Sequence, residues 1–208
     1  MSLALIDYGA GNLHSVHNAL KAAGAQDIRV TADPDIVAKA DRIVLPGVGA
    51  FAHCMEALSA IDGMTAAMER RVRVEGTPFL GICVGMQMLS DGSEEGSLPG
   101  LGWIPGNVRF FANTPVKAKL PMPHMGWNTV CPKEDSALFK YGFESEPQFY
   151  FLHSYYFDAK NKNDVSATAH YGIDFDAVVS KGNIHGIQCH PEKSHHWGSQ
   201  LLKNFAEL

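Results

Sequence analysis

Through residue 90 the chain alternates short apolar runs with longer stretches in which apolar residues recur at every third or fourth position. The short runs predict buried strands over residues 3–6, 28–31, 42–45 and 78–82. The longer stretches predict helices over residues 13–23, 34–40 and 51–75, the last broken near Asp62-Gly63. Residues 46–49, Pro-Gly-Val-Gly, are expected to end the third strand. Strands that alternate with helices in this way are typical of a parallel sheet covered by helices on both faces.

The pattern changes in the second half of the chain. Residues 91–106 contain five Gly and two Pro and predict a loop. Strand-like runs then follow at closer spacing, which favours antiparallel pairing, over residues 108–111, 149–152, 166–170, 177–180 and 184–188. A final amphipathic helix places four apolar residues on one face, namely Trp197, Leu201, Phe205 and Leu208. We expect one α/β domain over residues 1–208, with a mixed, mostly parallel sheet and a more antiparallel C-terminal part.

The composition narrows the classes of protein to which the chain can belong. Hydrophobic residues make up 46% and charged residues 19% of its 208 residues, which argues against intrinsic disorder. The net charge of −5 comes without a basic stripe, so we expect no binding to nucleic acid. No apolar run reaches the roughly 18 residues that a membrane span needs, and the N-terminus lacks the basic region of a signal peptide. These features predict a cytoplasmic protein without membrane contact.

Gly81-Ile82-Cys83-Val84-Gly85 is a candidate nucleophile site. The pattern is G-x-C-x-G between a predicted strand and a short helix, which is the nucleophile elbow with Cys in place of Ser. The flanking residues must be small, because a side chain at so sharp a turn would collide with neighbouring backbone. The helix N-terminus favours the thiolate, and the Val84 N–H would point at an oxyanion formed on an attacked carbonyl. The alternative interpretation is a buried Cys at a tight turn.

His190-Pro191-Glu192 supplies a candidate general base. In extended backbone, residues i and i+2 face the same side, so His190 and Glu192 are expected to lie together. A carboxylate beside an imidazole holds one tautomer and stabilises the imidazolium. Cys, His and an acid form a hydrolase triad. An ordinary surface His–Glu pair is the alternative.

The remaining cysteines and histidines carry no comparable pattern. Cys189, His190, His195 and His196 match no standard zinc spacing, and we expect no metal. The chain contains no C-x-x-C pair, so its thiols are expected to be reduced. Cys54 and Cys131 are interpreted as packing residues.

Residues 81–87 together with His190-Pro191-Glu192 resemble the class I (triad) glutamine amidotransferases. Six segments narrow the resemblance to the glutaminase subunits of imidazole glycerol phosphate synthases, namely residues 6–13, 46–51, 100–106, 123–128, 149–156 and 190–194. The resemblance spans nearly the whole chain. One residue departs from it: Cys189 stands where the family usually has Phe, which alters the packing behind His190.

The resemblance implies a reaction and a set of roles. Cys83 would attack the carboxamide of L-glutamine, His190 would transfer protons, and Glu192 would orient His190, with no cofactor. The oxyanion hole would combine the amides of Val48 and Val84. The residues expected to bind glutamine are Gly49, Gln87, His153, Ser154 and Tyr155.

The resemblance also implies a partner. It is a (β/α)8-barrel cyclase that forms a heterodimer with the glutaminase. The cyclase uses the ammonia to make imidazole glycerol phosphate and the aminoimidazole carboxamide ribotide in histidine biosynthesis. Four residues align with the family's interface segments, namely Asn12, Trp127, Lys193 and Ser194. Three alternatives stay open: a glutaminase subunit of a different ammonia-using synthase, a stand-alone cysteine hydrolase, and a non-catalytic scaffold that retains the fold.

Overall fold

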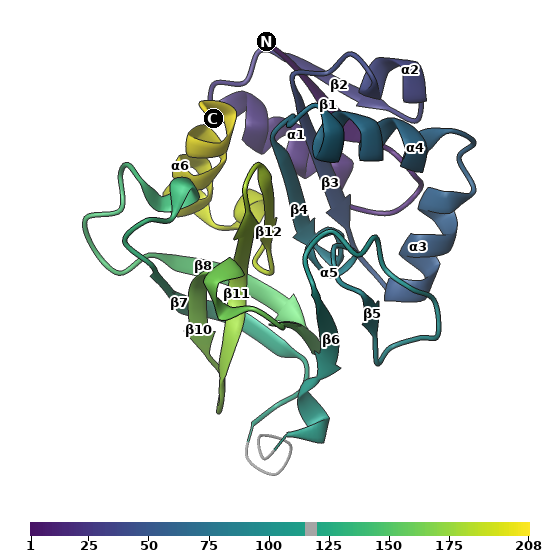
Figure 1. The fold of residues 1–208 in the computed structure, drawn as a ribbon. Coiled ribbons are helices and arrows are strands. Elements are labelled where there is room, and N and C mark those ends of the chain that lie inside the picture. The colour runs from purple at the N-terminus through teal and green to yellow at the C-terminus, as the bar shows by residue number, and fades with distance from the viewer. Residues whose placement is uncertain (115–119) are drawn as a thin grey trace.

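The computed structural model describes residues 1–114 and 120–208, and its N-terminal half forms a parallel sheet (Figure 1). The strands run in the order β2 (Asp27–Thr31), β1 (Ser2–Ile6), β3 (Arg42–Gly47) and β4 (Phe79–Cys83). Strand β12 (Ile184–Ile187) extends this sheet, parallel to β4. The four strands predicted in the first ninety residues are therefore confirmed, as is their parallel arrangement.

The C-terminal part of the sheet is antiparallel except for the short parallel pair of β5 and β6. Beyond β12 it continues through β11 (Asp174–Lys181), β10 (Val165–His170), β7 (His124–Pro132) and β8 (Gln148–His153). Three further strands attach through β11, namely β9 (Tyr155–Ala159), β6 (Gly106–Phe110) and β5 (Gly92–Ser93). Strand β12 is thus the point at which the parallel and antiparallel parts meet.

Helices cover both faces of the parallel sheet. Helix α1 (Leu13–Ala22) packs against α6 (His195–Ala206) on one face. The other face carries α2 (Pro34–Val37), α3 (Phe51–Ser59) and α4 (Met64–Glu69), the last continued by a π-helical turn over Arg70–Val74 (Figure 1). The short α5 (Val84–Gln87) follows β4 directly, and 3-10 turns cover Phe111–Asn113, Ala137–Phe139, Lys162–Asp164 and Pro191–Lys193. None of the helices in the described parts of the chain has the length and apolarity to cross a membrane.

Several boundaries differ from the sequence-based expectation. Strand β3 continues through Pro46 and Gly47, which lie opposite Ile82 and Cys83 of β4. Strand β1 pairs with β3 only as far as Val44, so the missing N–H of Pro46 leaves no gap in that ladder.

Three strands were not predicted. Strand β5 lies within the loop expected over residues 91–106, and in β7 and β9 the apolar residues do not mark a buried face. In β7 the apolar Met125 and Trp127 are exposed, and Gly126 stands between them. Strand β9 begins with the half-buried Tyr155 and Tyr156. At the C-terminus, Leu208 lies beyond α6 and is exposed rather than on the buried face of the helix.

The fold brings several chain segments to one edge of the sheet. The loop after β3, the end of β4 and the segment after β12 all lie at the carboxyl ends of parallel strands. In open α/β sheets this edge is where ligands bind. The corner between β8 and β9 reaches the same edge, because residues 153–155 line a cavity together with Cys83 and His190.

Candidate active site

Cys83 occupies a strained turn between β4 and α5. Its φ is +56°, a left-handed conformation that L residues rarely adopt. A Cβ on Gly81 would lie 2.4 Å from the Gly85 carbonyl oxygen, and a Cβ on Gly85 would lie 1.9 Å from the Leu45 carbonyl oxygen. The collision that the sequence predicts for larger flanking residues is therefore confirmed.

His190 lies between Cys83 and Glu192. Its Nδ1 is 2.9 Å from Glu192 Oε1, and the side chains of both residues are almost fully buried. A carboxylate only accepts, so Nδ1 carries a proton and Nε2 is left for Cys83. Burial lowers the pKa of His190, but hydrogen bonds to Cys83 and Glu192, and their negative charges, raise it to about 10. This environment favours the protonated form of His190.

The buried side chain of Ser194 hydrogen-bonds to the backbone of His190. Its Oγ donates to the His190 carbonyl (2.6 Å) and accepts from the Tyr150 N–H (3.0 Å). The His190 N–H in turn donates to the Tyr150 carbonyl (2.8 Å), which ties the His190 backbone to β8. Ser194 is fully buried, so it does not lie on the surface where it was expected. Its hydroxyl serves the backbone of His190 instead.

Two buried glutamines connect Cys83 to the β8–β9 corner. Gln87 Nε2 donates to the Tyr155 carbonyl (3.2 Å) and to Gln188 Oε1 (3.1 Å). Gln188 Nε2 then lies 3.7 Å from Cys83 Sγ, with its N–H directed at the sulfur. Sequence reasoning missed Gln188, although the alternation that pairs His190 with Glu192 puts Gln188 on the same side of an extended segment.

A cavity of about 300 Å³ opens beside Cys83 and His190. All the residues predicted for the oxyanion hole and for glutamine binding line it, namely Val48, Gly49, Val84, Gln87, His153, Ser154 and Tyr155. Glu192 is not among the lining residues. The volume is at the lower end of the range for small-molecule sites. Four further residues line the cavity, namely Glu95, Pro123, Leu152 and Lys193.

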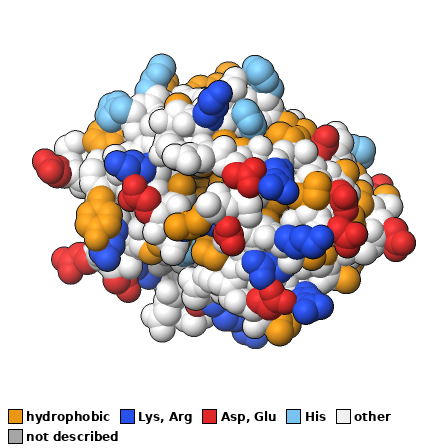
Figure 2. All heavy atoms as spheres, turned by 90° about the horizontal axis from the view of Figure 1, so that it is seen from above, with side chains coloured by type: hydrophobic (Ala, Val, Ile, Leu, Met, Phe, Trp, Pro, Cys, Tyr) orange, Lys and Arg blue, Asp and Glu red, His pale blue; other side chains and the backbone are white. Residues whose placement is uncertain are grey.

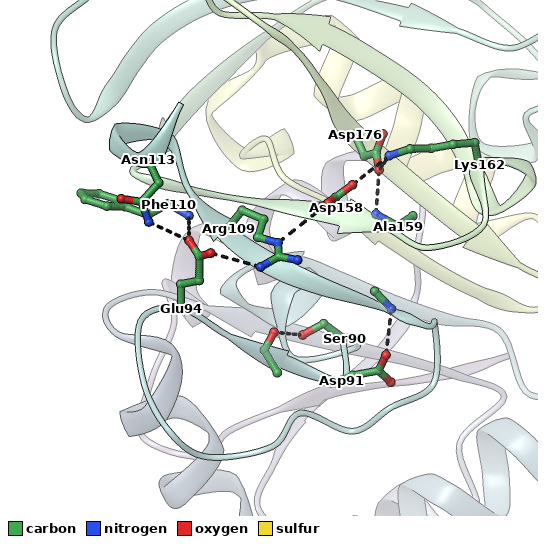
Figure 3. A network of polar contacts seen from close by, with 12 residues as sticks. Ser90, Asp91, Glu94, Arg109, Phe110, Asn113, Asp158, Ala159, Lys162 and Asp176 are labelled. Carbon is green, nitrogen blue, oxygen red and sulfur yellow. Dashed lines mark hydrogen bonds and ion pairs between the residues drawn. The ribbon is translucent and has the colours of Figure 1, made fainter. Parts of the chain in front are cut away.

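Glu95 brings a carboxylate to this cavity, and sequence reasoning missed it. Its Oε2 accepts the Phe51 N–H (2.7 Å) at the start of α3. The neighbouring Glu94 accepts hydrogen bonds from the Phe110 N–H (2.7 Å), Arg109 (3.1 Å) and Asn113 (3.1 Å), as Figure 3 shows. The segment that carries Glu95 is therefore fixed between α3 and β6.

Both ring nitrogens of His153 make hydrogen bonds within the protein. Its Nδ1 lies 2.7 Å from the Tyr155 carbonyl and must donate to it, so Nε2 accepts from His124 Nδ1 (2.9 Å). Burial lowers the pKa of His153 to about 3 and that of His124 to about 4, so both rings are neutral near pH 7. His153 thereby positions the backbone of residues 153–155.

Cys189, the residue that departs from the family pattern, is buried behind His190. Burial, together with the negative charge of Glu192, raises the pKa of its thiol well above the usual range. It is therefore held as a neutral thiol.

An apolar surface formed by Met125, Trp127 and Leu152 lies on β7 and β8, beside the cavity. These side chains are 65%, 46% and 38% exposed. His195 stacks on Trp127 at 5.2 Å, and Lys193 Nζ lies 5.7 Å from the centre of the Tyr150 ring. By contrast, the face seen from above in Figure 2 carries basic and acidic side chains interspersed.

Three of the four predicted interface residues are accessible. Trp127 and Lys193 are exposed, and Asn12 is partly exposed at the start of α1. Lys193 also lines the cavity, and Leu152 belongs both to the cavity lining and to the apolar surface, so the two are continuous.

Comparison with known proteins identifies the relatives of this chain. The family model for class-I glutamine amidotransferases matches residues 4–208. The imidazole glycerol phosphate synthase subunit HisH of Bdellovibrio bacteriovorus is 47% identical over 206 residues, which cover 99% of this chain and 100% of that protein. The protein of the same name from Zymomonas mobilis is 49% identical over 213 residues, covering 99% and 95%.

Solved structures with the same fold are more distant in sequence. A putative GMP synthase protein from Thermoplasma acidophilum has a TM-score of 0.71 at 18% identity, covering 100% of this chain and 92% of that one. The glutaminase domain of Trypanosoma brucei CTPS, solved with bound acivicin, has a TM-score of 0.67 at 17% identity, covering 100% and 94%. These likenesses show the fold.

Proposed function

This chain belongs to the class I glutamine amidotransferase family, and from that premise we propose that it is the glutaminase subunit of an imidazole glycerol phosphate synthase. It hydrolyses L-glutamine to L-glutamate and ammonia, and passes the ammonia to a cyclase. The observation that carries the proposal is the near-half identity, over the full length, to relatives of that name. The position of Cys83 and His190 at one cavity, with Glu192 buried behind His190, supports it.

The Cys83 thiolate attacks the carboxamide carbon of glutamine and forms a tetrahedral oxyanion. The imidazolium of His190 gives its Nε2 proton to the leaving nitrogen, which departs as ammonia and leaves a thioester on Cys83. His190 then takes a proton from water, which attacks the thioester and releases glutamate. The thiolate–imidazolium pair is thereby restored. Glu192 keeps Nδ1 protonated throughout.

The cavity offers complementary groups for the amino-acid end of glutamine. The carboxylate of Glu95 provides a counter-charge for the ammonium group. Gln87, together with the backbone of residues 153–155 and of Gly49, supplies neutral polar contacts. Because both protons of Gln87 Nε2 are already donated, its Oε1 is the atom left to accept from the substrate.

The register of β3 against β4 supports a gated oxyanion hole. The Ile43 N–H donates to the Pro78 carbonyl (3.0 Å), and the parallel register continues to Gly47 opposite Cys83. Bonds in such a ladder recur at every second residue, so the same pattern turns the Gly47 carbonyl toward the Val84 N–H. We propose that this carbonyl occupies the oxyanion position in the idle enzyme. Rotation of the Gly47–Val48 peptide would replace it with the Val48 N–H.

The partner in this proposal is a (β/α)8-barrel cyclase, which would form a heterodimer and carry the lyase activity. The apolar surface of Met125, Trp127 and Leu152 fits a protein partner, because exposed apolar side chains grouped beside polar ones mark interaction sites. Leu152 belongs to this surface and also lines the cavity, so docking there can alter the site. A cytoplasmic location accords with this role.

Glutamate release from the purified chain, with and without the cyclase and its ligand, tests the proposal. Loss of one oxyanion donor typically costs about 10²–10³ in rate. We therefore expect the isolated chain to be slow and the liganded complex to be at least about a hundredfold faster. Full activity without any partner would refute the assignment to a synthase and favour a stand-alone hydrolase. Stimulation by a different synthase but not by the cyclase would reassign the partner.

A further inference from the structure

We propose that Tyr8 and Cys54 are positioning residues that hold the two peptide units flanking the Gly47–Val48 peptide, so that this peptide alone rotates when the glutaminase is switched on. The inference rests on the function proposed above and concerns the regulation of the same site. Neither residue lines the cavity, and both are buried.

Tyr8 holds the peptide before the rotating one. Its hydroxyl donates to the Pro46 carbonyl at 2.7 Å and lies beneath the loop, 3.0 Å from where a Cβ on Gly47 would be. Burial, and the neighbouring Cys54, raise the pKa of Tyr8, so the hydroxyl keeps its proton and remains a donor. The Pro46 carbonyl is therefore fixed to a buried side chain of the segment that follows β1.

Cys54 holds the peptide after the rotating one. Its Sγ lies 3.5 Å from the Val48 carbonyl oxygen. Burial raises the pKa of its thiol, so the S–H is retained and donates. The Cys54 N–H also bonds to the Ala50 carbonyl (3.1 Å), and the Phe51 N–H is capped by Glu95 (2.7 Å). The Val48 carbonyl is thus tied to a helix end that is itself fixed.

The peptide between these two anchors is the one suited to rotate. Gly47 has no side chain to oppose a change in its ψ, and the side chain of Val48 is 42% exposed. Gly49 has a φ of +96°, and nothing lies within 4 Å of the position a Cβ would take there. With both neighbouring carbonyls held, rotation would carry the Val48 N–H along one path to one end point. A donor delivered in this way is preorganised, which is what an oxyanion hole requires.

The test compares Tyr8→Phe, Cys54→Ala and Cys54→Ser in the complex with the cyclase and its ligand. Each of the first two variants is expected to lower kcat for glutamine hydrolysis about three- to tenfold, with KM for glutamine unchanged. The double variant Tyr8→Phe/Cys54→Ala should lose more, up to a ceiling of about 10²–10³, the value of one oxyanion donor. Cys54→Ser retains a donor and should keep most of the activity. Tyr141→Phe and Cys131→Ala change the same groups at exposed positions and serve as matched controls.

Alkylation of Cys83 by iodoacetamide separates loop positioning from general damage, because that reaction uses no oxyanion hole. Its rate, followed by peptide mapping, should stay at the wild-type value in all three variants. Wild-type kcat in both Tyr8→Phe and Cys54→Ala would overturn the inference. A Cys54→Ser enzyme as slow as Cys54→Ala would also overturn it. The same holds if the rate of Cys83 alkylation in the variants falls in parallel with their turnover. A wild-type complex that releases no glutamate would instead refute the proposed function, and the anchors with it.

Discussion

Replacing Glu192 with Gln isolates the contribution of one buried charge. Glu192 Oε1 lies 2.9 Å from His190 Nδ1, and its side chain is 1% exposed, so water does not screen the interaction. A hydrogen bond to a charged group contributes about 1.5–3 kcal/mol, or about ten- to a hundredfold in rate. The substitution keeps the shape of the side chain and removes its charge.

A second effect of this substitution enlarges the expected loss. Glu192 Oε2 is buried and accepts no hydrogen bond from the residues that the structure describes. Nothing in those residues therefore selects which way the new amide turns. If its NH₂ faces Nδ1, the His190 proton moves to Nε2 and the wrong tautomer forms. The comparable change in a serine protease triad costs about 10⁴ in turnover. We expect a loss between about tenfold and about 10⁴.

Two assays measure the result in the complex with the cyclase. Glutamate release reports turnover, and the rate of Cys83 alkylation at neutral pH reports the thiolate. Both should fall, because Glu192 stabilises the imidazolium that pairs with the thiolate. Glu146→Gln removes the same charge at an exposed position and should leave both unchanged. Turnover and alkylation at wild-type values in Glu192→Gln would show that the third member of the triad lies elsewhere.

Four further outcomes are expected. Cys83→Ala should abolish glutamine hydrolysis while partner binding persists, and a glutamine-analogue electrophile should label Cys83 in the wild type; a label mapped to another cysteine would contradict this. Gly85→Ala should prevent a stable elbow, since its Cβ would lie 1.9 Å from the Leu45 oxygen, and circular dichroism with thermal melting should show the loss. Gln188→Met removes the N–H aimed at the Cys83 sulfur and should lower the rate of Cys83 alkylation about tenfold, whereas Gln26→Met at an exposed position should not; equal rates would exclude a role for this contact. Burial lowers the pKa of His124 and His185 to about 4 and that of His153 to about 3. Below pH 6.5, the ordinary pKa of a histidine, the unfolded chain therefore binds more protons than the folded chain. The contribution of these three histidines to stability should therefore be full above pH 6.5 and fall by on the order of 1 kcal/mol per histidine per pH unit between pH 6.5 and 4. Urea unfolding at several pH values checks this, and His185→Gln should reduce the slope by one proton; a flat profile over that range would contradict it.

The sequence alone determined the local parts of the site. Gly81 and Gly85 flank Cys83 because the elbow leaves no room for a side chain. A Cβ on Gly81 would collide with Gly85 in the elbow itself, whereas a Cβ on Gly85 would collide with Leu45 of the neighbouring β3. His190 and Glu192 meet because extended backbone places i and i+2 on one side. The parallel half of the sheet could equally be predicted from the sequence, since its strands and helices carry strong apolar periodicity.

Some residues could not be placed without the tertiary structure. Ser194 belongs to a motif that resembles an interface segment, yet the packing of β8 over the turn after β12 buries it completely. In strand β7 the apolar Met125 and Trp127 lie on the exposed face, so their pattern does not mark a buried strand. Burial of a given position depends on which other elements cover it, and a local pattern does not carry that information.

The contacts that complete the site join distant parts of the chain. Gln188 is separated from Cys83 by 105 residues and from Gln87 by 101, and Tyr8 from Pro46 by 38. The sequence separation of such pairs follows no local periodicity, because whole strands and helices lie between the two residues. The tertiary structure alone decided that the Gln188 amide faces the sulfur, and that the Tyr8 hydroxyl lies under the loop that is proposed to move.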